Sequence, residues 1–270
     1  MSNSNQIFTG EKMIAEKSGS VGIMIFNNPK RHNALSLSMW KDIPLILDLF
    51  EKDHDIRVIV LKGSGTQAFI SGADISEFNK ERSDINSISN YDLIVHEAST
   101  RLQYSEKPTI AMIRGYCIGG GLGIAISCDI RIANNQSTFA IPAAKLGLGY
   151  NIDSLKPLVF LVGPSFAKEI ICTARQFSSE EAIHMGLINR VVADHALDSY
   201  IDNYCTQLSD NAPLTISAAR QTINEIMNVN NTGINKNLCD ELLEKCFVSE
   251  DYIEGRKAFM EKRKPVFKGR

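Results

Sequence analysis

The residues best suited to chemistry lie in a glycine-rich stretch, Gly115-Tyr116-Cys117-Ile118-Gly119-Gly120-Gly121, that follows the apolar run 109–113. The run predicts a β-strand, and the apolar segment after the glycines predicts a helix that stops at Cys128-Asp129. Glycines at such a turn let a ligand approach the backbone, and a helix start presents unpaired N–H groups. These groups would stabilise a carbonyl oxygen that becomes negative during a reaction. Tight packing of a helix on a strand is the structural alternative.

A second turn of the same kind precedes the first. It has the sequence Ala68-Phe69-Ile70-Ser71-Gly72-Ala73-Asp74-Ile75, which runs from an extended apolar segment through glycine toward a helix. Two such turns predict a pair of backbone N–H groups around one oxygen.

Together the two motifs resemble the crotonase (enoyl-CoA hydratase/isomerase) superfamily. The resemblance extends over nearly the whole chain, with Asn33-Ala34-Leu35 near the start, Lys107-Pro108 before the glycine-rich stretch, and Phe259-Met260-Glu261-Lys262-Arg263 near the end. It implies an α/β fold, namely a crotonase-like spiral of ββα units with a C-terminal helical trimerisation region.

The resemblance also implies the ligand and its site. An acyl-CoA thioester would place its carbonyl oxygen between the backbone N–H groups of Ala73 and Gly120, and CoA would enter only as part of the substrate, with no permanently bound cofactor. Phe259 and Lys262 of a neighbouring subunit would lie against the nucleotide, although Lys262 alone also fits a solvated charge. The remaining CoA contacts implied are Lys30, Arg31, His32, Ser71 and Asp74.

The hydratases of this superfamily activate water with two glutamates, and this chain departs from them at both positions. Gly123 and Ala143 stand where the glutamates are expected, and neither residue exchanges a proton. Conventional hydration is therefore not expected. Decarboxylation, isomerisation by another base, hydration with other groups, and acyl-CoA binding without turnover stay open.

Within the superfamily the second half of the chain looks most like methylmalonyl-CoA decarboxylase. That relative has a tyrosine near the departing carboxylate, which Tyr150 matches, but it carries a histidine at the position of Ala73. Decarboxylation needs an enolate stabiliser and no strong base at the start, so the two backbone donors suit it. Tyr150 or water would then supply the proton.

The other polar candidates have structural alternatives. Some relatives that dehalogenate or isomerise carry an acidic residue at the position of Asn151. An asparagine cannot serve as a nucleophile or base, so that chemistry is not favoured here. Asp153 is expected to cap a helix. His96 aligns with a histidine of dehalogenase relatives but lies on a polar stripe that favours a solvated face. His32 fits packing or an adenine contact.

The amino-acid composition limits the classes of partner that this protein is expected to bind. The chain has 270 residues, 44% hydrophobic, and a formal net charge of −2, which gives no general attraction to nucleic acid or to an anionic membrane. The sequence contains no run of about eighteen apolar residues, so no membrane span is predicted. The cysteines form no metal-binding spacing, so a zinc site is not expected, and a reducing, cytoplasmic setting fits. The polar residues 1–6 are expected to form a frayed tail.

The elements that must position the two turns follow from hydrophobic periodicity. Strands alternate with helices up to about residue 140, which predicts the α/β class. Serines at 178 and 249 are expected to cap helices, and Gly163-Pro164 to break one. The expected strands are 13–16, 21–26, 58–61, 109–113, 129–133, 138–140 and 189–192, and the first long helices are 38–53 and 84–104.

Two regions are predicted. Residues 1–195 would form the α/β core with the acyl-CoA site, and residues 196–270 would form a helical oligomerisation region. The second region is small for a core of its own, so it is expected to pack on the first or on another subunit. The resemblance implies a homotrimer or a dimer of trimers.

Overall fold

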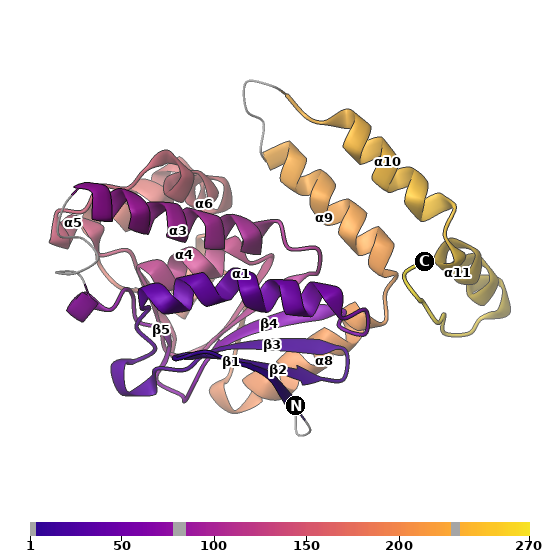
Figure 1. Ribbon diagram of the computed structural model, residues 1–270, viewed down its shortest axis with the longest axis horizontal. Coiled ribbons are helices and arrows are strands. Elements are labelled where there is room, and N and C mark those ends of the chain that lie inside the picture. The colour runs from indigo at the N-terminus through magenta and orange to yellow at the C-terminus, as the bar shows by residue number, and fades with distance from the viewer. Residues whose placement is uncertain (1–3, 78–84, 228–232) are drawn as a thin grey trace.

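Two β-sheets form the centre of the molecule, and helices cover both (Figure 1). The computed structural model describes residues 4–77, 85–227 and 233–270. The larger sheet has seven strands, and all its pairings from β3 onward are parallel. In spatial order its strands are β1 (Asn5–Thr9), β2 (Met13–Ser18), β3 (Val21–Phe26), β4 (Val58–Gly63), β6 (Thr109–Ile113), β8 (Ile130–Asn134) and β11 (Arg190–Val192).

The smaller sheet has four strands, in the order β10 (Phe177–Ser178), β9 (Thr138–Ala140), β7 (Tyr116–Ile118) and β5 (Ala68–Ile70). Its last three strands are parallel to each other. Each of them follows a strand of the larger sheet and leads into a helix, so the chain repeats a ββα unit. This confirms the predicted spiral of ββα units.

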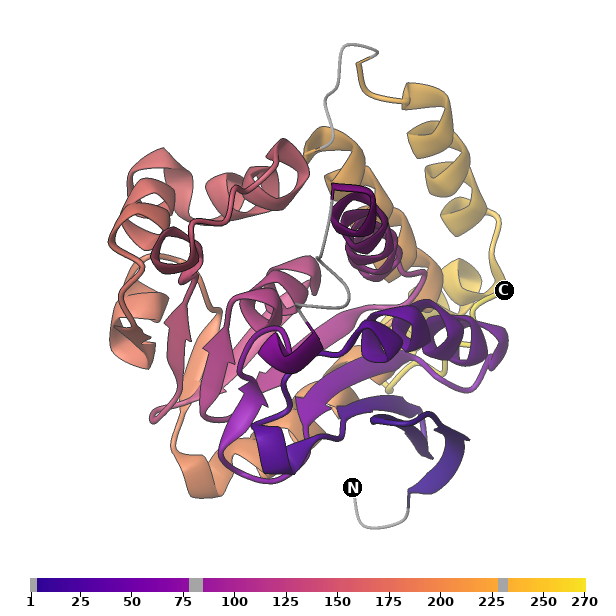
Figure 2. The same cartoon turned by 60° about the vertical axis from the view of Figure 1, so that its left-hand side comes forward.

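Each of the three parallel strands of the smaller sheet leads into helical structure. Helix α3 (Ile85–Gln103) comes after β5 and the short helix η2 (Ile75–Glu77), and α4 (Gly120–Ser127) comes directly after β7. The strand β9 leads into α5 (Ala143–Leu146) and then α6 (Ile152–Thr173), which kinks at Gly163 as predicted, since that residue has φ 74°. In Figure 2, α3 and the α5–α6 region lie on two sides of α4.

The main hydrophobic core lies between the two sheets and these helices. Helix α1 (Leu37–Lys52) contributes one apolar face, as the three- and four-residue spacing of its apolar residues predicts, and all five are buried: Met39, Ile43, Ile46, Leu47 and Phe50. Hydrophobic periodicity also predicts an apolar face on α3, made of Ile88, Tyr91, Val95, Ala98 and Leu102, and this prediction is wrong at one position. Ile88 is exposed, because only the later part of the helix, from Tyr91 to Leu102, reaches the core.

The opposite face of the larger sheet is covered by α8 (Leu197–Ser209). Leu197, Ile201 and Cys205 pack on alternate residues of three central strands, among them Val58 and Ile110. Because strand residues alternate between faces, the same strands serve both hydrophobic clusters. The helix is preceded by η3 (Asp194–Ala196), and α7 (Ser179–His184) connects β10 to β11. Ser178 caps α7 in a full capping box, as predicted.

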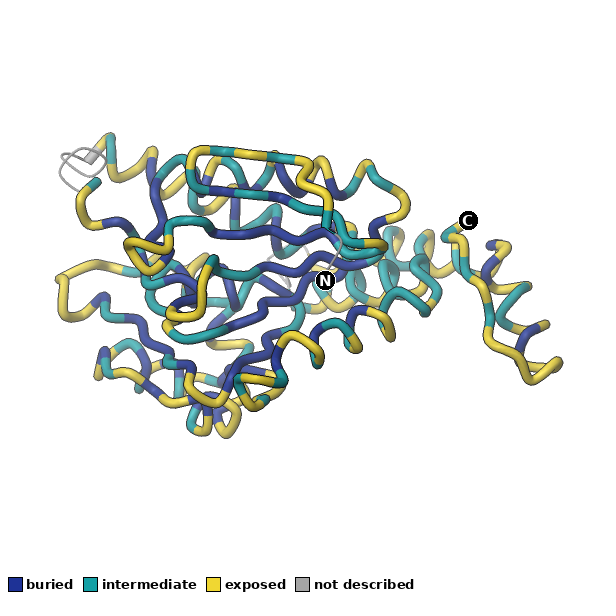
Figure 3. The backbone as a smooth tube through the Cα atoms, turned by 90° about the horizontal axis from the view of Figure 1, so that it is seen from below, coloured by how far each residue is buried: buried dark blue, intermediate teal, exposed yellow. Residues whose placement is uncertain are grey.

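The last helices extend away from the sheets. They are α9 (Pro213–Met227), α10 (Lys236–Phe247) and α11 (Glu250–Glu261), and Figure 3 shows that the buried residues concentrate in the strands, while the C-terminal helices are mostly intermediate or exposed. Ser249 caps α11 by accepting a hydrogen bond from the Tyr252 N–H, as predicted. The division at residue 195 and the role of this region in oligomers stay predictions.

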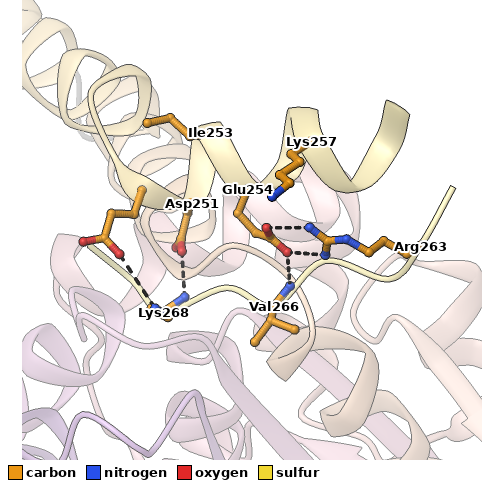
Figure 4. Close-up of a pocket in the computed structure, with 8 residues that line it drawn as sticks. Asp251, Ile253, Glu254, Lys257, Arg263, Val266 and Lys268 are labelled. Carbon is orange, nitrogen blue, oxygen red and sulfur yellow. Dashed lines mark hydrogen bonds and ion pairs between the residues drawn. The ribbon is translucent and has the colours of Figure 1, made fainter. Parts of the chain in front are cut away.

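The final residues fold back along α11 (Figure 4). Arg263 pairs with Glu254, and the buried Asp251 accepts hydrogen bonds from the backbone N–H groups of Lys268, at 2.6 Å, and Gly269, at 2.8 Å.

The expectation of a frayed N-terminal tail is wrong for Asn5 and Gln6. Both lie in β1, which pairs antiparallel with β2, while Phe8 packs against the main core. Backbone pairing at a sheet edge orders exposed polar residues without any apolar pattern. Residues 1–3 of the expected tail lie outside the described residues.

Candidate active site

The two predicted turns lie side by side. One follows β5 and the other follows β7, and these strands are adjacent and parallel, so both turns leave the same edge of the smaller sheet. The next parallel strand, β9, leads to Pro142 and Ala143 at that edge. Ligands of α/β sheets commonly bind beyond the carboxyl ends of parallel strands.

Gly119 lies where these three segments approach one another closely. A Cβ atom added to this residue would lie 3.8 Å from the Gly72 Cα and 3.9 Å from the Pro142 Cδ. Its N–H donates to the Ala140 carbonyl at 2.8 Å, and its φ of 54° is left-handed. Glycine is therefore suited to the point where the three segments meet.

The backbone N–H group of Ala73 points away from the adjacent segment that contains Leu35. Leu35 donates to the Gly72 carbonyl and accepts from the Asp74 N–H, each at 2.8 Å. These bonds form a short parallel bridge in which the Ala73 N–H takes no part. In an extended segment successive groups point to opposite sides, so this amide points to the side away from Leu35.

Gly120 is the first residue of α4, where a helix leaves its N–H groups unpaired. Neither the Gly120 amide nor the Ala73 amide donates to any residue in the described parts of the chain. The geometry therefore offers two backbone donors on adjacent turns.

Helix α4 is fixed at both ends. A Cβ on Gly121 would lie 2.5 Å from the Ile70 carbonyl oxygen, so the helix packs directly on β5. At the other end the buried Arg131 donates from Nη1 to the carbonyl oxygens of Cys128, at 2.7 Å, and Ala125, at 3.4 Å. A cation there also complements the helix dipole.

The two positions of the expected glutamates differ in their surroundings. A Cβ on Gly123 would meet no atom within 4 Å, although its neighbours Leu122 and Ile124 are fully buried. The face of α4 is therefore open at Gly123, whereas a Cβ on Gly120, one turn earlier, would lie 3.1 Å from the Leu35 Cδ1. Ala143 is buried and begins α5. No carboxylate stands at either position.

Tyr150 lies in the loop before α6, half-buried against the main hydrophobic core. The cap of α6 is Asn151, whose Oδ1 accepts from the Ser154 N–H at 2.9 Å, so the prediction that Asp153 caps this helix is wrong. Asn151 occupies the position with extended backbone before the helix, whereas Asp153 already lies inside the first turn.

Asp153 instead forms a contact that the sequence did not suggest. Its Oδ2 lies 3.6 Å from Nδ1 of His96, so the pair joins α3 to the start of α6. Both side chains are more than half exposed, in keeping with the polar stripe predicted for His96. No local pattern signals a contact between residues on two separate helices.

The predicted CoA residues fall into two groups. Lys30, Arg31 and His32 are exposed, and the Ser71 N–H donates to the His32 carbonyl at 3.1 Å, so this loop adjoins the first turn. The His32 ring also meets the Tyr116 ring edge-on, with 6.0 Å between centroids. Arg31 pairs with Asp74 at 2.7 Å.

Phe259 and Lys262 lie elsewhere. They sit at the end of α11, on the side of the molecule opposite to β5 and α5 (Figure 1). Phe259 is 83% exposed. Within one chain they are remote from the turns, and the prediction that they contact CoA on a neighbouring subunit stays untested.

Two cysteines flank α4 but are unsuited to act as nucleophiles. Burial raises the pKa of Cys117 and of Cys128, so both stay protonated thiols. Over residues 4–77, 85–227 and 233–270, no group of three His, Cys, Asp or Glu side chains is placed to hold a metal ion. In the same residues, no helix is long and apolar enough to cross a membrane.

Comparison with known proteins shows which family this chain is similar to. The family model of enoyl-CoA hydratase/isomerase matches residues 16–270. A short-chain-enoyl-CoA hydratase of Clostridium acetobutylicum is 35% identical over 254 residues, which cover 93% of this chain and 95% of the relative. A crotonyl-CoA hydratase of Syntrophomonas wolfei is 30% identical over 95% of this chain and 98% of its own length.

A crystal structure of an enoyl-CoA hydratase/carnithine racemase from Magnetospirillum magneticum has the same fold. It matches with a TM-score of 0.93 and 32% identity, covering 98% of this chain and 97% of that one.

Proposed function

Because this chain belongs to the enoyl-CoA hydratase/isomerase (crotonase) family, we propose that it binds an acyl-CoA thioester and stabilises the thioester's enolate between two backbone N–H groups. The donors are the amides of Ala73 and Gly120. Two preorganised donors are worth roughly 3–4 kcal/mol each to a developing oxyanion, judged from the removal of one such donor in other enzymes.

One observation carries this proposal. The two turns follow adjacent parallel strands, and both amides are left without an acceptor among the described residues. The close approach of Gly119 to Gly72 supports a single oxyanion site between them.

The reaction proposed differs from two-glutamate hydration. The similar proteins from Clostridium acetobutylicum and Syntrophomonas wolfei are hydratases, but Gly123 and Ala143 provide no carboxylate to activate water. We assign this chain to lyase or isomerase chemistry that passes through the enolate, which is then protonated by Tyr150 or by water.

Decarboxylation is the second candidate, favoured by the same two positions. Loss of CO₂ from a malonyl-type thioester breaks the Cα–carboxylate bond and leaves the electron pair as an enolate, so no base is needed at the start. An open, carboxylate-free face at Gly123 avoids repelling the substrate's negative charge. A binder without turnover is the alternative outside catalysis.

The proposed assembly is a homotrimer or a dimer of trimers. Its support is the exposed apolar surface of the last helices, on which Ile226, Phe247 and Phe259 are all more than half exposed. Patches of this kind mark protein interfaces.

The test proceeds in two steps. Purified protein should show a higher melting temperature with acyl-CoA thioesters, and a lack of any shift would refute binding. Incubation with crotonyl-CoA, a 3-enoyl-CoA and methylmalonyl-CoA, followed by mass analysis, then identifies the reaction. A gain of water, a shifted double bond or a loss of CO₂ separates the enzymatic outcomes. Binding without any product would establish the non-catalytic alternative.

A further inference from the structure

A buried carboxylate lies next to the first oxyanion donor. The side chain of Asp74, which follows Ala73, is only 5% exposed. Its Oδ1 accepts from Arg31 Nη1 at 2.7 Å, from the Ser76 hydroxyl at 2.7 Å and from the Ser76 N–H at 3.1 Å. A buried charge is unfavourable unless it is paired and hydrogen-bonded, so placing the Asp74 carboxylate here costs stability. Its position beside the Ala73 amide suggests that it has a function there.

The carboxylate is ionised in the folded protein. Burial, the largest influence, raises the pKa of Asp74, but hydrogen bonds from Ser76 and Arg31 outweigh it and lower the pKa overall. The pair with Arg31 is therefore a true ion pair at neutral pH.

The backbone around this pair forms a clamp on one edge of the turn. The segment from His32 to Leu35 runs alongside the segment from Ser71 to Asp74, joined by three backbone hydrogen bonds of 2.8–3.1 Å. The Ser71 hydroxyl adds a bond to the Arg31 carbonyl at 3.3 Å. The two bonds that Leu35 makes, to Gly72 and Asp74, lie on the side away from the Ala73 N–H.

The loop that carries Arg31 is itself fixed. Asn33 is 1% exposed, has a left-handed φ of 56°, and donates from Nδ2 to the carbonyls of Ala68, at 2.8 Å, and Ser64, at 3.0 Å. Its Oδ1 accepts from the Asn28 N–H at 3.0 Å. Arg31 therefore reaches Asp74 from a frame that is anchored to β5.

We propose that Arg31 and Asp74 are positioning residues, whose ion pair fixes the direction of the Ala73 N–H in the oxyanion site. Nη1 of Arg31 donates to both Asp74 and Ser76, so in this proposal Arg31 acts through Asp74 and not by binding a CoA phosphate. This inference rests on the proposed function.

The test separates polarisation of the thioester from binding of the nucleotide. The probes are a dienoyl-CoA, whose conjugated carbonyl absorbs at longer wavelength when its oxygen is hydrogen-bonded, and free CoA, which has no such carbonyl. The variants are Arg31→Ala, Asp74→Asn and Arg31→Lys. The control is Arg101→Ala, which removes another guanidinium that pairs two acids, Asp48 and Glu51, between α1 and α3. Melting curves establish that each variant is folded.

We expect Arg31→Ala and Asp74→Asn to lose most of the red shift. They should also weaken dienoyl-CoA binding by about two- to tenfold, the range of one hydrogen bond, while leaving CoA affinity unchanged. Arg31→Lys keeps the charge without the planar fork and should recover part of the shift. Arg101→Ala should match the wild type. Should Asp74→Asn fail to fold, Arg31→Ala, whose side chain is 55% exposed, decides the question alone.

Two results would overturn the inference alone. They are a full red shift in Arg31→Ala and Asp74→Asn, or an equal loss of affinity for CoA and for the thioester, which would make Arg31 a nucleotide ligand. A wild-type protein that binds dienoyl-CoA without a red shift would refute the proposed function and this inference with it.

Discussion

The packing of α4 makes three glycines differ sharply in what an added methyl group would do. At Gly123 the new Cβ meets no atom within 4 Å, and at Gly120 it comes within 3.1 Å of the Leu35 Cδ1, the end of a flexible side chain. At Gly121 it would lie 2.5 Å from the Ile70 carbonyl oxygen and 2.6 Å from the Ile70 Cβ, neither of which can rotate away.

The magnitudes follow from two opposing effects. Replacing a helical glycine by alanine contributes roughly 0.5–1 kcal/mol through lower backbone entropy in the unfolded chain. Overpacking at a tight site costs roughly 1–3 kcal/mol. Gly123→Ala should therefore stabilise the protein by up to about 1 kcal/mol, Gly120→Ala should be close to neutral, and Gly121→Ala should destabilise it by up to about 2 kcal/mol.

Thermal melting without ligand measures these differences. The two variants share the entropy gain and differ by the overpacking cost of roughly 1–3 kcal/mol, so at roughly 2–4 °C per kcal/mol Gly121→Ala should melt about 2–12 °C below Gly123→Ala. The absence of ligand keeps any effect on thioester binding out of the comparison. If Gly121→Ala melts as high as Gly123→Ala, the close contact of α4 with β5 is wrong, and so is the placement of the second oxyanion donor.

Three further predictions concern separate parts of the molecule. If the reaction is a decarboxylation with Tyr150 as proton donor, Tyr150→Phe should lower kcat by about 100-fold or more, and an unchanged rate would remove Tyr150 from the mechanism. Leu197→Ala should destabilise the protein by roughly 2–5 kcal/mol in denaturant unfolding, because this fully buried side chain attaches α8 to the larger sheet; a cost below about 1 kcal/mol would contradict that packing. Hydrogen bonds from Arg263 and from the Val266 N–H lower the pKa of Glu254 from 4.5 to about 2, so their contribution is present above pH 4.5 and is lost as the pH falls toward 2. The melting temperature of Arg263→Ala should accordingly lie below that of the wild type at pH 7 and approach it near pH 2, whereas a difference independent of pH would show that charge is not its origin.

Much of the fold could be predicted because the pattern of apolar residues follows directly from burial. The strand at 109–113 is buried on both faces, and α1 buries one side at helical spacing, so each leaves a clear periodicity in the sequence. The edge strand β1 left no such signal, because its order comes from backbone pairing with β2 and not from its own side chains.

The site could be predicted only in part. Glycine turns after two strands signal backbone donors, but only the sheet order puts β5 next to β7 and brings the turns together. The same limit explains the contacts that the sequence did not suggest. Arg31 meets Asp74, and His96 meets Asp153, across distances along the chain that no local pattern spans. Asn151 rather than Asp153 caps α6 because either residue type suits a cap and only the backbone angles distinguish them.

The central claim is that the Ala73 and Gly120 amides bind one thioester oxygen, and a crystal structure of the protein with a bound acyl-CoA tests it most directly. We predict that the carbonyl oxygen lies about 2.7–3.1 Å from both backbone nitrogens, with the acyl chain passing the open face of α4 at Gly123. An oxygen directed at a side chain or at solvent, out of hydrogen-bonding reach of either amide, would contradict the account.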